Sequence, residues 1–435
     1  MRDPAKYLGK VTVSVNYDRY RLEINDPTSG QTIKYRFYAG WSAKTAEDQG
    51  MRPDKVKLDF DKPAYREGQD KARLTITPPH GGEALIFILV MLSLLILTSI
   101  NSAKMSVSYR EVVSQTAAFI LGMIALIVIY TIGYNYLHDL DRPMYIASIA
   151  LLLTVYIPAL GLVINGSRAW INLGVTTVQP SEFVKPIFIL LTAKKLSKFN
   201  KTDLNLRDLG ITLLYTMPII IIIAKEDFGS SLVFLSILAV MLIFAGLDKR
   251  IIIAMTACII LLMPISYNVM KGHQKDRIDA FLHPDNLALP GNHHVFQSKI
   301  AIGSGGFLGK GLFAGTQKEL GYLPVQSSDF IYSVICEELG LLGGLLVLVM
   351  IGVLLYNIVK ICLDANSLYA KLICAGVFAM IAFQTIENIA MTMGVMPVAG
   401  ITLPFVSYGG SSIISMLISI GLVLSVNKSS YKTQI

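Results

Sequence analysis

The chain has 435 residues, of which 53% are hydrophobic and only 16% are charged, and its mean hydropathy is positive. This composition is not that of an ordinary soluble protein, and it predicts helices of about 20 residues that cross a bilayer. The formal charge of +8 is typical of a membrane protein with basic cytoplasmic loops, so we expect no nucleic acid partner.

The first 82 residues differ from the rest, because they carry 15 of the 38 basic and 11 of the 30 acidic residues. Polar and apolar residues alternate in "KVTVSVNYDRYRLEI", "TIKYRFYA", "KVKLDF" and "ARLTITPP", as is typical of strands. Residues 1–82 are therefore expected to form a small, mainly β cytoplasmic accessory domain that binds a cytoplasmic partner, or else an inert appendage. The first apolar run begins too late for a cleaved signal peptide, which favours a cytoplasmic amino terminus.

Residues 83–435 predict a polytopic α-helical membrane protein with about ten transmembrane helices. The expected spans are 84–100, 113–135, 144–163, 181–197, 209–224, 228–246, 250–270, 330–357, 370–392 and 405–426.

Basic residues set the expected orientation in the cytoplasmic (inner) membrane. If the helices alternate, the connections 194–207, 248–250 and 360–371 and the basic C-terminal tail fall on one side, which should be cytoplasmic together with both termini. The external side then receives 164–180, 225–227 and 394–404, and a large extracellular loop at 271–329. A loop of that length is rarely a mere connection.

Charged residues near the first external segments are candidates for a site. Arg168 and Trp170 suit interfacial anchoring, or alternatively the recognition of an anionic group. Glu182 and Lys185 share a helix face at a spacing of three residues, so the pair is a buried brace or part of a polar site. Asp227 begins another span, where the helix dipole alone would favour it.

The stretch "MPVAGITLPFVSYGGSS" breaks the helical pattern with Pro and Gly at membrane depth and carries Ser407 and Tyr408. Irregular backbone at that depth is tolerated only against protein or water, so this stretch is expected to line a cavity.

Asp329 lies in "SSDFIYSVICEELG", at the outer end of an apolar helix. It could act as a helix cap, or as a general base whose pKa is raised by partial burial. A base needs a positive neighbour to hold the second substrate, and Arg168, Lys185 and Arg277 are the candidates. Glu337 and Glu338 are expected to order the helix and its polar surroundings instead.

Two other features carry no site. The glycines between Gly303 and Gly315 lack the GxxxxGK[ST] pattern of a phosphate-binding loop. The four cysteines, Cys258, Cys336, Cys362 and Cys374, have neither disulfide-framework nor zinc-site spacing and are expected in the core.

Taken in order, the motifs "SRAWINLG…QPSEFVK", "EDFGSSL", "DRIDAFLHPDN", "QSKIAIGSGGFLGKG…GTQKELGYLP…SDFIYSVICEELG" and "MPVAGITLPFVSYGGSS" resemble those of the SEDS family (shape, elongation, division and sporulation). These are the RodA/FtsW-type peptidoglycan glycosyltransferases. The resemblance covers nearly all of residues 84–426, and "IAIGSGG…GTQ" is more similar to the elongation branch than to the division branch.

The resemblance implies an inverting glycosyltransferase of ten spans that polymerises lipid II at the outer face of the cytoplasmic membrane, usually with a class B penicillin-binding protein. It implies Asp329 as the catalytic base. The substrate-binding residues that we expect are Arg168, Trp170, Gln179, Ser181, Glu182, Lys185, Asp227, Arg277, Ser407 and Tyr408. No cofactor is evident, although a divalent cation, Mg or Mn, could assist a pyrophosphate leaving group.

The sequence departs from the family pattern at two places. Ser327 and Ser328 precede Asp329 where the family usually has His-Thr, which puts in doubt an imidazole role but not the carboxylate. The amino-terminal domain is no part of the usual pattern.

Two rival functions stay open at this point. A lipid II transporter would suit intramembrane charges such as Glu387 equally well, and a noncatalytic scaffold of a cell-wall complex would use residues 1–82 as its dock.

Overall fold

In the computed structural model, the described residues are 11–16, 19–25, 32–38, 75–77, 82–102, 109–164, 166–172, 174, 176–199, 204–248, 250–253, 267–268, 270, 272–289, 291–323 and 325–432. The chain divides into two compact units, Met1–Glu83 with Lys428–Ile435, and Ala84–Asn427. Each unit is considered by itself.

The first unit contains a four-stranded sheet in the order β3-β2-β1-β4. Its strands are β1 (Val11–Asn16), β2 (Arg19–Asn25), β3 (Thr32–Tyr38) and β4 (Thr75–Thr77). β2 pairs antiparallel with both β1 and β3, whereas β4 runs parallel to β1. Three of the alternating segments contain these strands, and the expected strand in "KVKLDF" lies outside the described residues. The role of residues 1–82 as an accessory domain stays a prediction.

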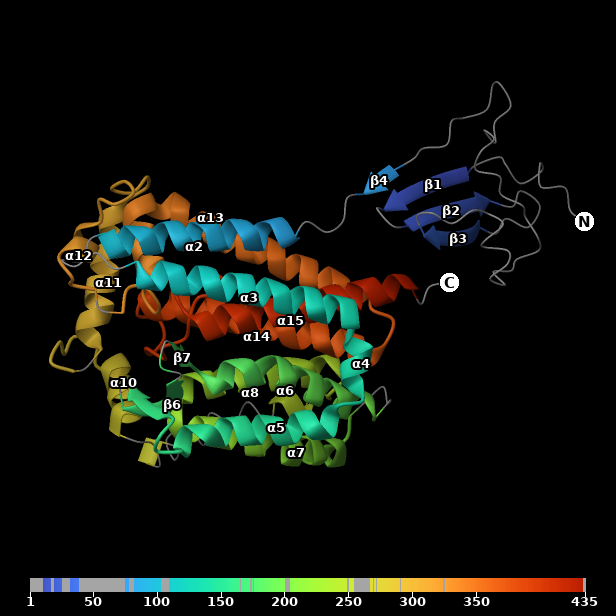
Figure 1. Ribbon diagram of the computed structural model, residues 1–435, viewed down its shortest axis with the longest axis horizontal. Helices are drawn as coiled ribbons and strands as arrows, with labels where there is room; N and C mark the ends of the chain where they lie inside the picture. Colours follow the sequence, from blue (N-terminus) through green and yellow to red (C-terminus); the bar gives the residue numbers. More distant parts are fainter. Residues whose placement is uncertain are drawn as a thin grey trace, which may run out of the picture. The chain divides into compact units, whose positions relative to one another are not determined.

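The second unit is a bundle of long apolar helices, shown side by side in Figure 1. Six helices are long and apolar enough to cross a membrane, among the residues that the structure describes, and α8 is a shorter apolar helix. The bundle helices are α2 (Gly82–Ser102), α3 (Arg110–Ile132), α5 (Asp141–Leu153), α6 (Pro180–Ser197), α7 (Leu206–Glu226), α8 (Phe228–Phe244), α13 (Ile331–Asp364), α14 (Leu368–Thr392) and α15 (Gly410–Lys432), with the short α4 (Tyr134–His138) joining α3 to α5. The integral membrane fold is therefore helical and polytopic. The count of ten stays a prediction, because most of the expected span 250–270 lies outside the described residues.

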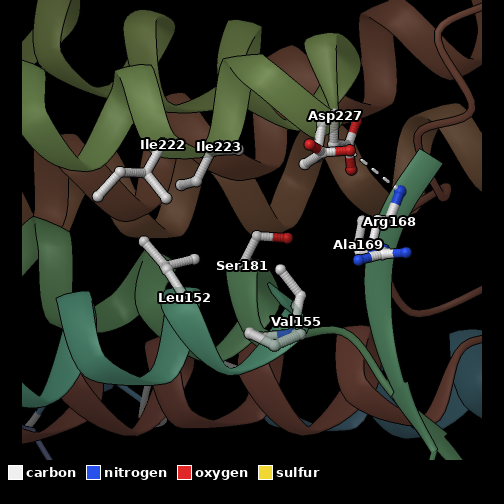
Figure 2. Close-up of a pocket in the computed structure, with 10 residues that line it drawn as sticks. Leu152, Val155, Arg168, Ala169, Ser181, Ile222, Ile223 and Asp227 are labelled. Carbon is white, nitrogen blue, oxygen red and sulfur yellow. Dashed lines mark hydrogen bonds between the residues drawn. The ribbon is translucent and has the colours of Figure 1, made fainter. Parts of the chain in front are cut away.

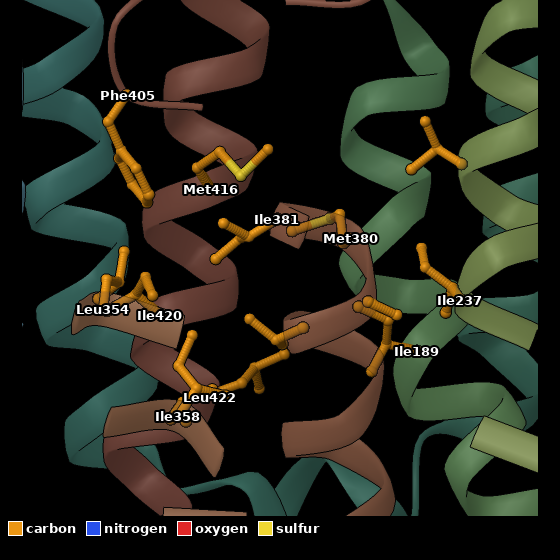
Figure 3. Close-up of a cluster of buried hydrophobic side chains, with 14 of the residues drawn as sticks. Ile189, Ile237, Leu354, Ile358, Met380, Ile381, Phe405, Met416, Ile420 and Leu422 are labelled. Carbon is orange, nitrogen blue, oxygen red and sulfur yellow. The ribbon is translucent and has the colours of Figure 1, made fainter. Parts of the chain in front are cut away.

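α14 lies at the centre of the bundle and packs against α6, α8 and α13. Gly376 allows this close approach, because a Cβ there would meet the side chains of Ile189 on α6 and Met241 on α8. Figure 3 shows the buried aliphatic side chains between these helices, among them Ile237 and Met380. This rigid packing fixes where the helix ends, and hence the site residues, come to lie.

The expected helix 144–163 was wrong beyond residue 153. α5 ends at Leu153 and is followed by a 3₁₀ turn, η2 (Thr154–Tyr156), and an antiparallel sheet of β5 (Gly161–Ile164), β6 (Ser167–Asn172) and β7 (Thr177–Val178). Pro158 cannot donate a helical hydrogen bond, and Gly161 packs directly on the carbonyl of Val155. The chain therefore turns into a hairpin instead of continuing the helix.

The segment 271–329 is not a plain loop, because it contains α10 (Gly272–Leu282), α11 (Asn292–Gly305) and α12 (Thr316–Glu319). Figure 1 shows α10, α11 and α12 at the same end of the bundle as β6 and β7. The last helix begins at Gly410 and not at residue 405, because Phe405 has a positive φ of 63° in the preceding turn.

Helix α13 is kinked at Gly340, where φ is 69° and ψ is −167°. The backbone of residues 306–311 bonds to residues 337–342 and replaces the helical hydrogen bonds lost there. Gly309 and Gly340 meet backbone to backbone, so a Cβ on either would collide with the other's main chain. The glycine-rich stretch thus serves close packing against the kink.

Candidate active site

Asp329 lies in the turn that precedes α13, at the end of the bundle that carries α10 to α12. The helix has Phe330 at its N-cap position and no side-chain capping hydrogen bond, so the capping role considered for Asp329 is not observed. One carboxylate oxygen, Oδ1, accepts a hydrogen bond of 2.9 Å from the hydroxyl of Ser328. No hydrogen bond to the other oxygen, Oδ2, occurs among the described residues.

The second carboxylate oxygen of Asp329 and the guanidinium of Arg277 both reach Gly400. A Cβ placed on Gly400 would lie 3.5 Å from Oδ2 of Asp329 and 3.7 Å from Nη1 of Arg277. Arg277 projects from α10, and its Nη1 donates a hydrogen bond of 2.9 Å to the carbonyl of Ala399. Of the three candidate positive neighbours, Arg277 is the one that meets Asp329 at this glycine.

Burial raises the pKa of Asp329 to about 6, although the Ser328 hydroxyl and the Arg277 charge hold it down and the charge of Asp227 pushes it up. A carboxylate with a pKa near the operating pH is a better general base than an ordinary exposed one. The electrostatics of the turn therefore suit proton abstraction.

Hydrogen bonds from α14 and from residues 400–409 fix the backbone around Asp329. The hydroxyl of Ser407 donates to the carbonyl of Ser328 at 2.5 Å, and the backbone N–H of Tyr408 donates to the carbonyl of Ser327 at 2.9 Å. Asn388 on α14 donates to the carbonyls of Asp329 at 3.0 Å and Ile401 at 2.8 Å. Ser407 and Tyr408, predicted as substrate-binding residues, thus contact the turn, and Asn388 was not predicted.

Asp227 caps helix α8. Its carboxylate accepts bonds from the backbone N–H of Ser230 at 3.0 Å and from the Ser230 hydroxyl at 2.7 Å. The predicted residue Gln179 donates from its side-chain amide to Asp227 at 2.8 Å. This network joins the start of α6 to the start of α8 beside Asp329.

Arg168 and Ser181 line a small hollow with a volume of about 20 Å³. Figure 2 shows Arg168 and Asp227 at one end of this hollow and aliphatic side chains such as Ile222 at the other. Arg168 lies in strand β6, and the backbone N–H of Arg168 donates a hydrogen bond of 3.3 Å to Oε2 of Glu226. The hollow combines a charged end, formed by Arg168, Glu226 and Asp227, with an apolar end.

Three predicted residues lie apart from this hollow. Glu182 and Lys185 form a buried ion pair of 2.6 Å within α6, which places them in the bundle as the sequence spacing indicated. Trp170 lies on β6 opposite Leu162 of β5. No contact of these three residues with Asp329 or Arg277 is present in the described part of the chain.

Glu337 and Glu338 bind lysines that sequence reasoning missed. The carboxylate of Glu338 accepts bonds from Lys318 at 2.5 Å and from Ser99 at 2.6 Å, and all of these groups are buried. Glu337 pairs with Lys310 at 2.7 Å. Two adjacent buried acids require cations nearby, but nothing in their spacing shows which lysines supply them.

No group of three or more His, Cys, Asp or Glu side chains that could hold a metal ion occurs among the described residues. The expected divalent cation therefore has no ready-made protein cage in this part of the chain, and it stays a prediction.

Comparison with known proteins places these features in a family. The FtsW/RodA/SpoVE family, described as "Cell cycle protein", matches residues 83–432. The stage V sporulation protein E of Bacillus subtilis is 36% identical over 320 residues, which cover 71% of this chain and 84% of that protein. The peptidoglycan glycosyltransferase MrdB of Escherichia coli is 33% identical over 346 residues, covering 79% of this chain and 91% of that protein.

Solved structures agree with this result. A chain from a study titled "Structural coordination of polymerization and crosslinking by a peptidoglycan synthase complex" superimposes with a TM-score of 0.69 and 29% identity, covering 81% of this chain and 98% of that chain. The rod shape determining protein RodA of Thermus thermophilus superimposes with a TM-score of 0.60 and 27% identity, covering 81% and 97% of the two chains. The relatives include a stage V sporulation protein and glycosyltransferases named RodA and FtsW, so the elongation branch stays a prediction.

Proposed function

The chain belongs to the FtsW/RodA/SpoVE family of cell cycle proteins and is a peptidoglycan glycosyltransferase of the cytoplasmic membrane, and we propose that Asp329 is the general base of its transfer reaction. The observation that carries this proposal is the meeting of the Asp329 carboxylate and the Arg277 guanidinium at Gly400, at one end of a helical bundle. A base and a cation that both reach the same glycine suit a reaction that removes a proton and releases an anion.

The first substrate that fits is lipid II, and the growing glycan chain is the second substrate. Asp329 takes the proton of the GlcNAc 4-hydroxyl while that oxygen attacks C1 of the MurNAc residue at the end of the chain. The bond from C1 to the pyrophosphate breaks, and the configuration at C1 is inverted. The proton ends on Asp329, and the electron pair leaves with the polyprenyl pyrophosphate.

The leaving group needs positive charge and not a proton, because a pyrophosphate is already a stable anion. Arg277 beside Asp329 and Arg168 at the mouth of the hollow are the cations that we assign to it. A divalent cation could add charge at the same place, but no step depends on it.

Topology and partners complete the proposal. The basic loops put both termini in the cytoplasm, which leaves Asp329 facing the outside, where lipid II is polymerised. A class B penicillin-binding protein would cross-link the product, in keeping with a structural neighbour from a study of a synthase complex that couples polymerisation to crosslinking.

The test is polymerisation of lipid II by the purified protein in detergent. Asp329→Asn should abolish polymer formation, with elution on gel filtration and thermal unfolding unchanged. The matched control is Asp285→Asn, which removes an exposed carboxylate from the same external segment and should leave the rate unchanged. Near-normal polymer from Asp329→Asn would refute the assignment.

The same assay separates polymerisation from lipid transport, because a detergent solution has no second compartment into which a lipid could move. If the wild-type protein makes no polymer with or without a transpeptidase partner and divalent ions, while it moves lipid II across vesicle membranes, the transporter interpretation holds instead.

A further inference from the structure

Helix α3 carries a buried polar side chain, Gln115, that the proposed reaction does not use. Among the described residues of α3, three are buried, namely Gln115, Ala118 and Gly122. A Cβ on Gly122 would collide with the Leu417 side chain of α15, so α3 packs closely on that helix. This contact brings Gln115 to the segment that precedes α15. An amide buried inside the bundle is costly unless its polar atoms are bonded.

Both polar atoms of the Gln115 amide bond to the backbone of residues 407–409. Its Nε2 donates to the carbonyl of Ser407 at 3.1 Å, and its Oε1 accepts from the N–H of Gly409 at 3.1 Å. Only one orientation of the amide satisfies both bonds, because one partner is an acceptor and the other is a donor. Gln115 therefore fixes the peptide groups on both sides of Tyr408.

The peptide group between Ser407 and Tyr408 connects Gln115 to the turn before α13. Its carbonyl accepts the bond from Gln115, and its N–H donates to the carbonyl of Ser327 at 2.9 Å. This peptide group is planar and trans, so its carbonyl and its N–H point in opposite directions. Anchoring the carbonyl on Gln115 therefore sets the direction of the N–H that holds the turn.

The same segment reaches Asp329 by a second route. The hydroxyl of Ser407 donates to the carbonyl of Ser328 at 2.5 Å, and the hydroxyl of Ser328 donates to Oδ1 of Asp329 at 2.9 Å. Buried hydrogen bonds that follow one another in this way strengthen each other. If Gln115 released residues 407–409, both routes would loosen, and a displacement of about 1 Å is enough to weaken a catalytic group greatly.

We propose that Gln115 is a positioning residue for the general base. By fixing the peptide groups on both sides of Tyr408, it holds the backbone of residues 327–329 where the Asp329 carboxylate can take the proton of the substrate. This inference rests on the proposed role of Asp329. Because both polar atoms of Gln115 are used within the protein, its loss should affect kcat and not the binding of substrate.

The experiment measures lipid II polymerisation by the purified full-length protein with three substitutions. Gln115→Met keeps the length of the side chain but can form neither bond, so it should lower kcat at least about tenfold and leave KM within about twofold. Gln115→Glu should restore most of kcat, because burial favours the neutral form of a carboxylic acid, which can donate to the Ser407 carbonyl and accept from the Gly409 N–H. Gln384→Met is the matched control and should leave kcat unchanged, because Gln384 of α14 is equally buried and its amide has no hydrogen-bond partner among the described residues.

A Gln115→Met protein with the wild-type kcat overturns the inference. So does an equal kcat for Gln115→Met and Gln115→Glu, or a fall in kcat that only matches the loss of folded protein on gel filtration, because either would indicate packing alone. If Gln115→Met does not fold, Gln115→Asn decides, because its amide is one methylene too short to keep both bonds: a reduced kcat supports the inference, and a wild-type kcat refutes it. Asp329→Asn is measured in parallel: if that protein is active, the proposed function fails, whereas an inactive Asp329→Asn beside an unchanged Gln115→Met refutes this inference alone.

Discussion

The buried ion pair between Lys318 and Glu338 gives a strong prediction about stability. Both side chains are fully buried, with Nζ and Oε1 2.5 Å apart, and the pair ties α12 to α13. Lys318→Met removes the cation and leaves Glu338 with a single hydrogen bond, from Ser99. Removing one partner of a buried pair typically costs about 3–5 kcal/mol, because an uncompensated charge stays in the interior.

The neighbouring pair is an internal standard. Lys310 has a side chain that is 24% exposed, and Glu337 keeps donors from the Thr316 hydroxyl and the Gln317 backbone if Lys310 is lost. Lys310→Met should therefore cost only about 1–2 kcal/mol, since water screens part of the lost interaction.

The free energy of unfolding would be measured by SDS titration in mixed micelles for Lys318→Met, Lys310→Met and the double variant Lys318→Met with Glu338→Leu. The double variant should recover most of the loss, because it removes both charges. The reasoning is wrong if Lys318→Met costs less than Lys310→Met, or if the double variant is less stable than Lys318→Met alone.

Three further outcomes are expected. The kcat for lipid II polymerisation should fall as pH drops through about 6, because the raised pKa of Asp329 leaves the base protonated below that value; a rate that is flat between pH 5 and 8 would contradict this. Gly400→Ala should cost about 1–2 kcal/mol of stability, because the backbone there has a φ of 72°. Denaturation checks this, with Gly352→Ala, whose Cβ would meet open space, as the control. Asn388→Leu should reduce kcat at least about tenfold with little change in KM, because the Asp329 and Ile401 carbonyls lose their shared donor; an unchanged kcat would show that the turn holds its shape without Asn388.

Much of the bundle could be predicted from the sequence, because apolar runs of about 20 residues have few alternatives to membrane helices. The expected spans agree with α2, α3, α6 and α14 within a few residues. The expectation was wrong at residues 154–163, since hydropathy does not distinguish a continuing helix from an apolar hairpin. Pro158 and Gly161 in this segment indicate a break in the helix, but the prediction from hydropathy did not take them into account.

The candidate site shows the same division. Asp329 and Arg277 were both proposed from the sequence, but Arg168, Lys185 and Arg277 were equal candidates for the neighbour of Asp329. The fold distinguishes them, because Lys185 forms a buried ion pair with Glu182 and Arg168 lines the hollow beside Asp227. Arg277 alone of the three meets Asp329 at Gly400.

The sequence by itself determined a helical membrane protein, its apolar segments and the acid that precedes α13, because each of these follows from a local pattern. Only the tertiary structure decided which charges meet: Lys310 and Lys318 with the two glutamates of α13, and Arg277 with Asp329 at Gly400. The physical reason is that the members of each pair lie 20 or more residues apart in the chain, so their contacts depend on how the segment before α13 folds back on the bundle.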